Sequence, residues 1–265
     1  MFTTQRLICL LLAAGSLSAH DLYPMPERFH VLTGETVTIA LHDGDAFPDS
    51  EVSAPLERVR DAFLRAASGS AAVSHLRVDG KRALGDVSVP GKGDLLLTLR
   101  TIPNFIELKP EEFLSYLKEE GLTHVIDWRT KYNETSKPGR ERYSKYAKSI
   151  LTAGAPGEEY RKPAGLVLEI VTLRNPALIR QGETLPVQVL FRGAPAASLQ
   201  LEAAWAGPNG TKVQVAGQTD SQGRLNVPIA SNGKWRLHTL RMERCAEPAV
   251  ADWESYWSSL TFEIR

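Results

Sequence analysis

The chain has 265 residues, of which 43 % are hydrophobic and 23 % charged, a composition typical of a globular protein with a proper core. Its 31 basic and 31 acidic residues balance, so no net charge draws the chain to nucleic acid, and we predict no nucleic-acid partner. Collagen-like, disordered and disulfide-scaffold proteins are excluded, but composition assigns no function.

The first residues predict export. Arg6 precedes an apolar run over residues 7–14, and small residues follow up to Ala19, which is the pattern of a secretory signal peptide. No run reaches the roughly 20 apolar residues that cross a bilayer. We therefore expect a signal peptide at residues 1–19 and a periplasmic or secreted mature chain without a membrane span. Cleavage after Ala19 would make His20 the first residue and leave Cys245 without an internal disulfide partner.

The C-terminal part, residues 156–265, reads as an immunoglobulin-like β-sandwich. Alternating apolar residues separated by turn residues such as Asn209-Gly210 are typical of short antiparallel strands. Seven strands are expected in this unit, near Val167 to Leu173, Leu185 to Phe191, Leu199 to Trp205, Lys212 to Thr219, Arg224 to Ile229, Lys234 to Arg241 and Ser258 to Ile264.

An internal echo predicts a second sandwich unit at residues 20–108. Gly34-Glu35-Thr36 and Gly182-Glu183-Thr184 each form a turn that enters an alternating strand, and a later strand pair repeats in the same order. The expected fold class is mainly β, with two immunoglobulin-like β-sandwich units and a helical insertion between them.

The helical insertion is expected at residues 109–155. Pro110 begins a first helix whose apolar stripe, including Phe113 and Leu117, ends before Gly121. A second helix is predicted from near Pro138, because apolar residues from Tyr143 to Ile150 fall at i, i+3, i+4 and i+7. Helical spacing also occurs at residues 56–67, where an irregular strand is the alternative.

His20 is the sharpest candidate site residue. An amino-terminal histidine offers a free α-amine and an imidazole nitrogen, so one residue can close a chelate on a metal ion. A further imidazole would complete a three-nitrogen set suited to Cu(II) or Ni(II). The alternative is that signal peptidase simply cuts before a histidine and that the terminus frays, as chain ends usually do.

Four further residues are candidate ligands. His42 ends the first Gly-Glu-Thr strand, and His238 lies on the matching late strand of the second unit. Met242 and Glu243 follow and could add a thioether and a carboxylate. Each of them also has a packing interpretation. The predicted metal ligands are thus His20, His42, His238, Met242 and Glu243, for nickel, cobalt or copper.

An acidic loop at residues 43–51 gathers four carboxylates and could hold a hard cation. Its spacing differs from that of a calcium-binding loop, so a solvated acidic turn is the preferred interpretation.

We predict that the protein is not an enzyme, because no Walker A, Gly-x-Ser-x-Gly, His-Glu-x-x-His or Cys-x-x-Cys motif is present. A dispersed catalytic triad would leave no such motif, however. Two alternative functions stay open. The protein could be a binding module for a cell-surface glycan or peptide that uses the aromatic rings of Trp253 and Trp257 or a sandwich edge. A copper-dependent oxygenase could use His20 beside a second imidazole.

Several stretches resemble a family of bacterial periplasmic domains of unknown function that carry the name nickel uptake transporter family, similar to NikM and its periplasmic companion. The similar stretches are the Ala-His start at residues 19–24, the segment 138–149, the segment 235–238 and the segment 253–262. Together they span nearly the whole mature chain. Tyr23 stands where the family often has Trp.

The resemblance implies a periplasmic β-sandwich protein of nickel or cobalt uptake, in which a binding protein passes metal to a membrane transporter. Only the position of His20 carries over as a ligand. We therefore predict a periplasmic transition-metal-binding accessory or carrier protein with a membrane metal transporter as partner.

Overall fold

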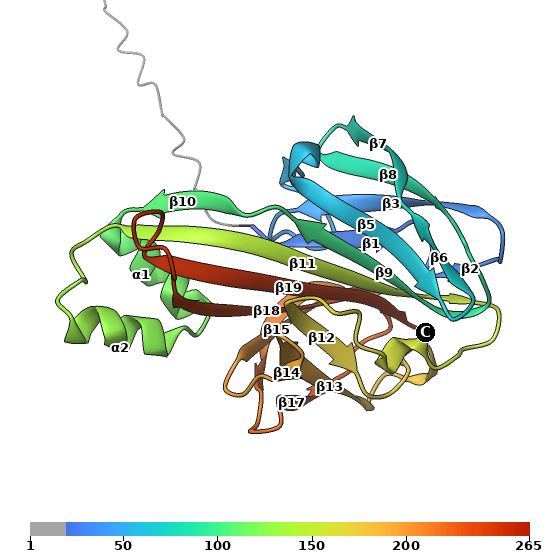
Figure 1. Ribbon diagram of the computed structural model, residues 1–265. Coiled ribbons are helices and arrows are strands. Elements are labelled where there is room, and N and C mark those ends of the chain that lie inside the picture. The colour runs from blue at the N-terminus through green and yellow to red at the C-terminus, as the bar shows by residue number, and fades with distance from the viewer. Residues whose placement is uncertain (1–19) are drawn as a thin grey trace, which may run out of the picture.

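The computed structural model describes residues 20–265 as a mainly β protein (Figure 1). The predicted signal peptide and its cleavage site lie outside these residues. Within them, no helix is both long and apolar enough to cross a membrane.

A ten-stranded sheet runs through the length of the molecule. Its main path is β16 (Gly210–Gln218), β15 (Gln200–Gly207), β18 (Gly233–Arg244), β19 (Trp253–Ile264), β11 (Gly139–Ala153), β9 (Gly93–Thr101), β5 (Val59–Ala66) and β6 (Gly69–Ala72). The short strands β2 (His30–Val31) and β10 (Asn104–Leu108) pair with β11. The strands β11 and β19 are parallel, and this pair joins the two halves of the chain in one sheet.

Two smaller antiparallel sheets pack on this large sheet, above and below its long strands in Figure 1. The first contains β1 (Leu22–Pro26), β3 (Thr36–Asp43), β8 (Arg82–Ser88), β7 (Ser74–Asp79) and β4 (Val52–Ser53). The second contains β12 (Leu168–Thr172), β13 (Thr184–Phe191), β14 (Ala194–Pro195) and β17 (Arg224–Pro228).

Each small sheet forms a separate apolar core with the large one. In the first half, Ile39 and Leu41 of β3 pack with Leu97 and Leu99 of β9, and all four are at most 1 % exposed. In the second half, residues of β12 and β13 pack on β18 and β19 around the fully buried Trp235. This is the face-to-face packing of a β-sandwich, which the alternating apolar pattern predicts.

The seven strands expected after residue 156 are confirmed as β12, β13 and β15 to β19, and β18 and β19 are each several residues longer than expected. The ambiguous segment at residues 56–67 consists of a 3-10 turn, η1 (Leu56–Arg58), followed by β5. Two further 3-10 turns are η2 (Glu159–Arg161) and η3 (Pro176–Leu178).

The helical insertion is only partly helical. Helix α1 (Pro110–Glu119) forms where it was predicted, and α2 (Thr123–Lys131), which the pattern did not indicate, follows it. The helix predicted from Pro138 is wrong, because this segment is the strand β11. It lies between β9 and β19 and is buried on both faces, so its apolar residues show no strand alternation and match a helical spacing by coincidence. The division into units at residues 108 and 155 stays a prediction.

Candidate metal centre

His20 is the first residue that the structure describes and lies beside two carboxylates. Its Nδ1 is 3.3 Å from Asp45 Oδ2 and 3.7 Å from Glu51 Oε2. Among the His, Cys, Asp and Glu side chains of residues 20–265, these three form a group whose possible ligand atoms all lie within 4.8 Å of one another. One imidazole nitrogen and two carboxylate oxygens thus point to one place.

The loop after β3 brings the two carboxylates to His20. Gly44 has φ +149, and a Cβ at this position would lie 2.7 Å from the backbone nitrogen of Glu51, so only glycine lets the loop fold back this closely. The Asp45 amide donates to Glu51 Oε2 at 2.7 Å, which fixes the two acids against each other. Phe47 anchors the loop in a small apolar cluster with Tyr23 and Met25.

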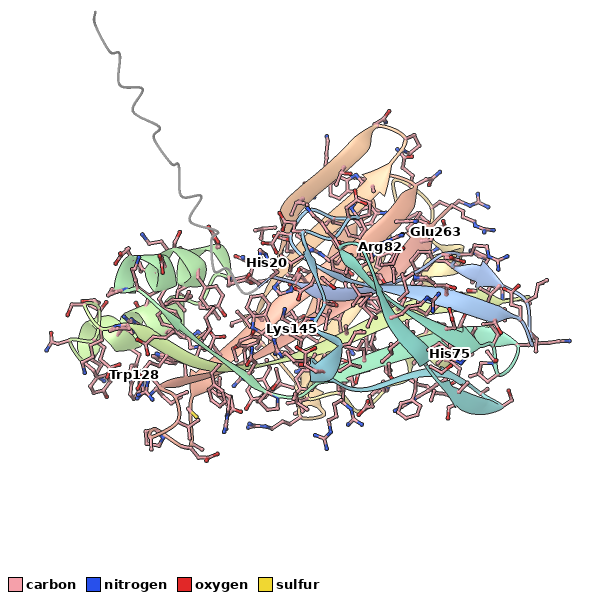
Figure 2. All side chains as sticks on the ribbon, turned by 90° about the horizontal axis from the view of Figure 1, so that it is seen from above. His20, His75, Arg82, Trp128, Lys145 and Glu263 are labelled. Carbon is pink, nitrogen blue, oxygen red and sulfur yellow. The ribbon has the colours of Figure 1, made fainter. Side chains whose placement is uncertain are left out.

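The backbone of His20 is tied down. The buried ammonium of Lys145, on β11, donates to the His20 carbonyl and to Asp43 Oδ1, the latter at 3.2 Å. Figure 2 shows His20 at the start of the described chain, close to Lys145. On the other side, the Asp21 amide donates to Asp45 Oδ1 at 3.4 Å. The fraying expected of a chain end therefore does not apply to the chain from His20 onward.

A buried charge network anchors the next residue. The carboxylate of Asp21, which is 4 % exposed, forms ion pairs with His238 Nδ1 at 2.7 Å and with Arg236 Nη1 at 3.1 Å. Glu120 accepts a hydrogen bond from His238 Nε2 at 3.0 Å, and Glu202 accepts one from Arg236 at 2.8 Å. With a carboxylate at each ring nitrogen, His238 is held as an imidazolium.

The same charges set the pKa values of this network. Burial alone would raise the pKa of Asp21, but the positive charges of His238 and Arg236 outweigh it and lower the pKa to about 2. Burial also opposes the charged form of His238, yet Asp21 and Glu120 raise its pKa well above the usual 6.5. Burial raises the pKa of Asp43, and Lys145 acts against this rise.

The five predicted ligands do not converge. His42 is stacked on Tyr23, with ring centres 5.2 Å apart, and its Nδ1 lies 2.9 Å from Ser50 Oγ. Burial lowers the pKa of His42 to about 4, so its ring is neutral at pH 7. His238 is occupied by carboxylates on both sides, as described above. Of the five, only His20 belongs to the group of three among the described residues.

Met242 and Glu243 have structural partners instead. The Met242 side chain is 2 % exposed in a cluster with Trp253 and Trp257. Glu243 accepts a hydrogen bond from Arg192 at 2.7 Å and one from the Tyr256 hydroxyl at 3.2 Å. Neither side chain belongs to the group around His20 within the part of the chain that the structure covers.

Sequence reasoning missed Lys145, and it did not connect Asp45 and Glu51 with His20. The acidic loop is visible in the sequence, but nothing there says that it folds back on His20. The pairing of Tyr23 with His42 in the β1–β3 ladder is what sets the loop beside the first residue. Lys145 was assigned to a helix that does not exist.

The stacking role considered for Trp253 and Trp257 loses its structural basis. Trp253 and Trp257 are 2 % and 4 % exposed, so neither ring offers a face to a sugar. A copper oxygenase would need a second imidazole beside His20. Among residues 20–265, the group of possible metal ligands around His20 adds the carboxylates of Asp45 and Glu51 and no second imidazole.

A family model for a domain of unknown function, DUF4198, matches residues 17–243. The chain belongs to the DUF4198 family. No curated protein matches it. Among solved structures, the chain is similar to FdeC, an Escherichia coli adhesin, at 16 % identity and a TM-score of 0.26. The match covers 94 % of this chain and 65 % of the FdeC chain, so this chain spans less than two thirds of the length of FdeC. The D0-D1 domain of intimin is similar at 13 % identity and TM-score 0.23, covering 92 % of this chain and 97 % of that one.

Proposed function

We propose that the mature DUF4198 protein binds a divalent transition metal through His20, Asp45 and Glu51 and serves as a periplasmic carrier or accessory protein of nickel or cobalt uptake. The observation that carries the proposal is the convergence of the His20 imidazole and two carboxylates at the first residue of the predicted mature chain.

Cleavage after Ala19 would add a ligand to this group. The free α-amine and Nδ1 of His20 close a six-membered chelate ring through Cα, Cβ and Cγ, and Nδ1 is the ring nitrogen that faces Asp45 and Glu51. The resulting donor set contains two nitrogens and two carboxylate oxygens. Imidazole is a ligand suited to nickel, copper, zinc and iron, and carboxylates add negative charge.

The charge balance supports a dication. Asp45 and Glu51 bring two negative charges, and Lys145, which donates to the His20 carbonyl, is paired with Asp43 at 3.2 Å. His20 is 23 % exposed, and the carboxylates are 58 % and 43 % exposed, so a metal ion has a path in and out. Such access suits a protein that passes a metal on, whereas a structural site is closed.

Calorimetric titration of metal-free protein tests the proposal. The protein is produced with His20 as its first residue and titrated with Ni(II), Co(II) and Cu(II). We expect His20→Ala and the double variant Asp45→Asn, Glu51→Gln each to weaken binding at least about tenfold, a change of 1.4 kcal/mol. The matched control is His75→Ala, since His75 is exposed on β7.

A chain with one alanine added before His20 separates the amine from the imidazole. The added residue keeps all side chains but opens the six-membered chelate, so the affinity for Co(II), which does not displace the proton of the new amide, should fall in this variant too. Equal affinity of the wild type and His20→Ala for all three metals would refute the proposal.

A further inference from the structure

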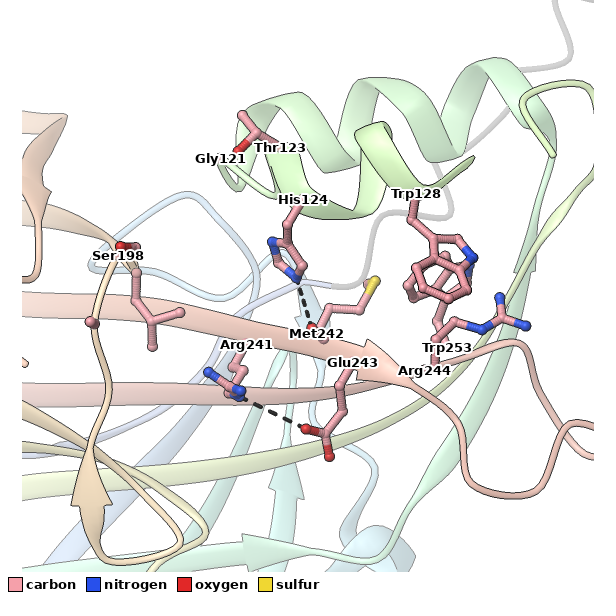
Figure 3. Close-up of a pocket in the computed structure, with 12 residues that line it drawn as sticks. Gly121, Thr123, His124, Trp128, Ser198, Arg241, Met242, Glu243, Arg244 and Trp253 are labelled. Carbon is pink, nitrogen blue, oxygen red and sulfur yellow. Dashed lines mark hydrogen bonds and ion pairs between the residues drawn. The ribbon is translucent and has the colours of Figure 1, made fainter. Parts of the chain in front are cut away.

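A groove of about 450 Å³ lies between helix α2 and strand β18 (Figure 3). Residues 121–128 form one wall, the loop at residues 197–199 closes one end, and residues 241–244 with Trp253 line the floor. Its volume lies in the range of about 300 to 1,000 Å³ that is usual for ligand sites. None of the residues of the proposed metal site lines it.

The groove follows an edge of the large sheet. Side chains on a strand alternate between the two faces, so a groove lined by four consecutive residues of β18 must lie along the edge of that strand. The neighbour β15 pairs with β18 only as far as the Leu201–Thr239 pair. Beyond it, no strand among residues 20–265 pairs with residues 240–244 on this side.

The chain turns away where β15 could have continued along β18. Ser198, just before β15, has φ +58, a left-handed conformation that bends the loop out of the sheet. The Nε2 atom of His124, on α2, lies 3.0 Å from the carbonyl oxygen of Met242. The backbone of Met242 therefore faces the groove. The groove therefore occupies the place of a missing strand.

The residues that line the groove favour a ligand that carries both a carboxylate and an apolar side chain. The Arg241 guanidinium lies over the Phe191 ring at 4.4 Å, and its Nε is 3.9 Å from Oε2 of Glu243, a carboxylate that Arg192 already binds. Arg241 thus has positive charge to offer, and Arg244 lies over the Trp253 ring at 4.8 Å. Trp128 is 39 % exposed and lies beside Arg244 and Trp253, where it can cover an apolar side chain (Figure 3).

We propose that this groove binds an extended acidic peptide segment of a partner protein, which adds a strand to β18 beside residues 240–244. Main-chain hydrogen bonds to a sheet edge supply affinity in such complexes, and pockets for alternate side chains supply specificity. At Met242 a peptide amide takes the place of His124, whose Nε2 lies 3.0 Å from the carbonyl oxygen. The peptide carboxylate pairs with Arg241, and its apolar residue packs on Trp128.

Fluorescence polarisation with a labelled peptide tests this inference. The probe is acetyl-Val-Asp-Val-Phe-Val-amide with fluorescein on a lysine linker, and two controls replace its Asp by Lys or N-methylate alternate amides. We expect the acidic probe to bind and each control peptide to bind at least about tenfold more weakly, because each loses a charge-assisted or main-chain hydrogen bond.

Variants place the peptide in the groove. Arg241→Met and Trp128→Ala should each weaken binding of the acidic probe at least about tenfold, whereas Arg60→Met, at an exposed position of β5, should not. Amide NMR shifts on adding the probe should concentrate at residues 240–244. Absence of binding at millimolar probe, full binding of the N-methylated peptide, or equal binding by Arg241→Met and wild type would each overturn the proposal.

Discussion

At the scale of single residues, the carboxylate of Asp21 holds the start of the chain in place. It lies buried between His238 and Arg236, so Asp21→Asn removes the carboxylate that both buried cations share and leaves each with one partner, Glu120 for His238 and Glu202 for Arg236. Breaking a buried pair in this way typically costs about 3 to 5 kcal/mol of unfolding free energy. Urea denaturation at pH 7 measures this loss. The control Asp79→Asn breaks the exposed pair with Arg82 and should cost less than about 1 kcal/mol.

A second residue-scale prediction concerns Glu141 on β11. Burial raises the pKa of Glu141 to about 7, although it accepts hydrogen bonds from the Ser255 and Tyr116 hydroxyls. The folded state therefore holds a proton that the unfolded chain releases near the ordinary pKa of 4.5. This stabilising contribution is present below pH 4.5 and is lost as the pH rises through about 7.

Glu141→Gln should remove that pH dependence. The neutral amide cannot ionise, so the variant should gain up to about 3 kcal/mol relative to the wild type between pH 4.5 and pH 8. Urea unfolding at a series of pH values gives the difference, with Glu107→Gln at an exposed position of the neighbouring strand β10 as control. A constant difference between wild type and Glu141→Gln across this range would contradict the prediction.

The candidate metal site was only half predictable from sequence. His20 was identified from its position after the predicted cleavage site, which is a local pattern. Asp45 and Glu51 reach it through the β1–β3 pairing and the conformation of Gly44, and neither is a local signal. His238 was proposed as a ligand because of its residue type, but it acts on the site through Asp21.

At the scale of elements, prediction succeeded where one face of a strand is buried and failed where both faces are. Strands such as β13 alternate buried and half-buried residues, so their pattern identified them. Strand β11 is covered on both faces, and its last seven residues are all buried. Helix α2 was missed because its buried residues are few, Val125 and Arg129.

The junction of β11 and α1 yields the third prediction. Gly139 lies under Phe113, and a Cβ there would come within 2.2 Å of the ring, which is itself fully buried. Gly139→Ala should therefore displace α1 and lower the unfolding free energy by about 1 to 3 kcal/mol. Thermal unfolding checks this, with Gly69→Ala as control, since a Cβ at Gly69 meets no atom within 4 Å. Equal melting temperatures of the two variants would argue against the close contact.

At the scale of the whole molecule, the two halves share one sheet. Residues from both parts of the chain meet in the parallel β11–β19 pair, from Glu141 beside Trp253 to Ser149 beside Thr261. The sequence echo predicted two sandwich units, and each small sheet does form an apolar core with the large sheet. The strand β11, which the pattern assigned to the helical insertion, belongs to the sheet that both cores share. Shared strands couple the cores, whereas a flexible linker would leave them independent.

The halves should therefore unfold together. Leu99→Ala in the first core and Ile170→Ala in the second, both fully buried, should each cost about 2 to 5 kcal/mol. Hydrogen exchange in urea, followed at the amides of β3 and of β13, should show each variant lowering both midpoints by the same amount, because a cooperative unit has one transition. Leu32→Ala, at a side chain that is 70 % exposed, is the control. Two independently folding sandwiches would instead give a shift in β3 alone for Leu99→Ala and in β13 alone for Ile170→Ala.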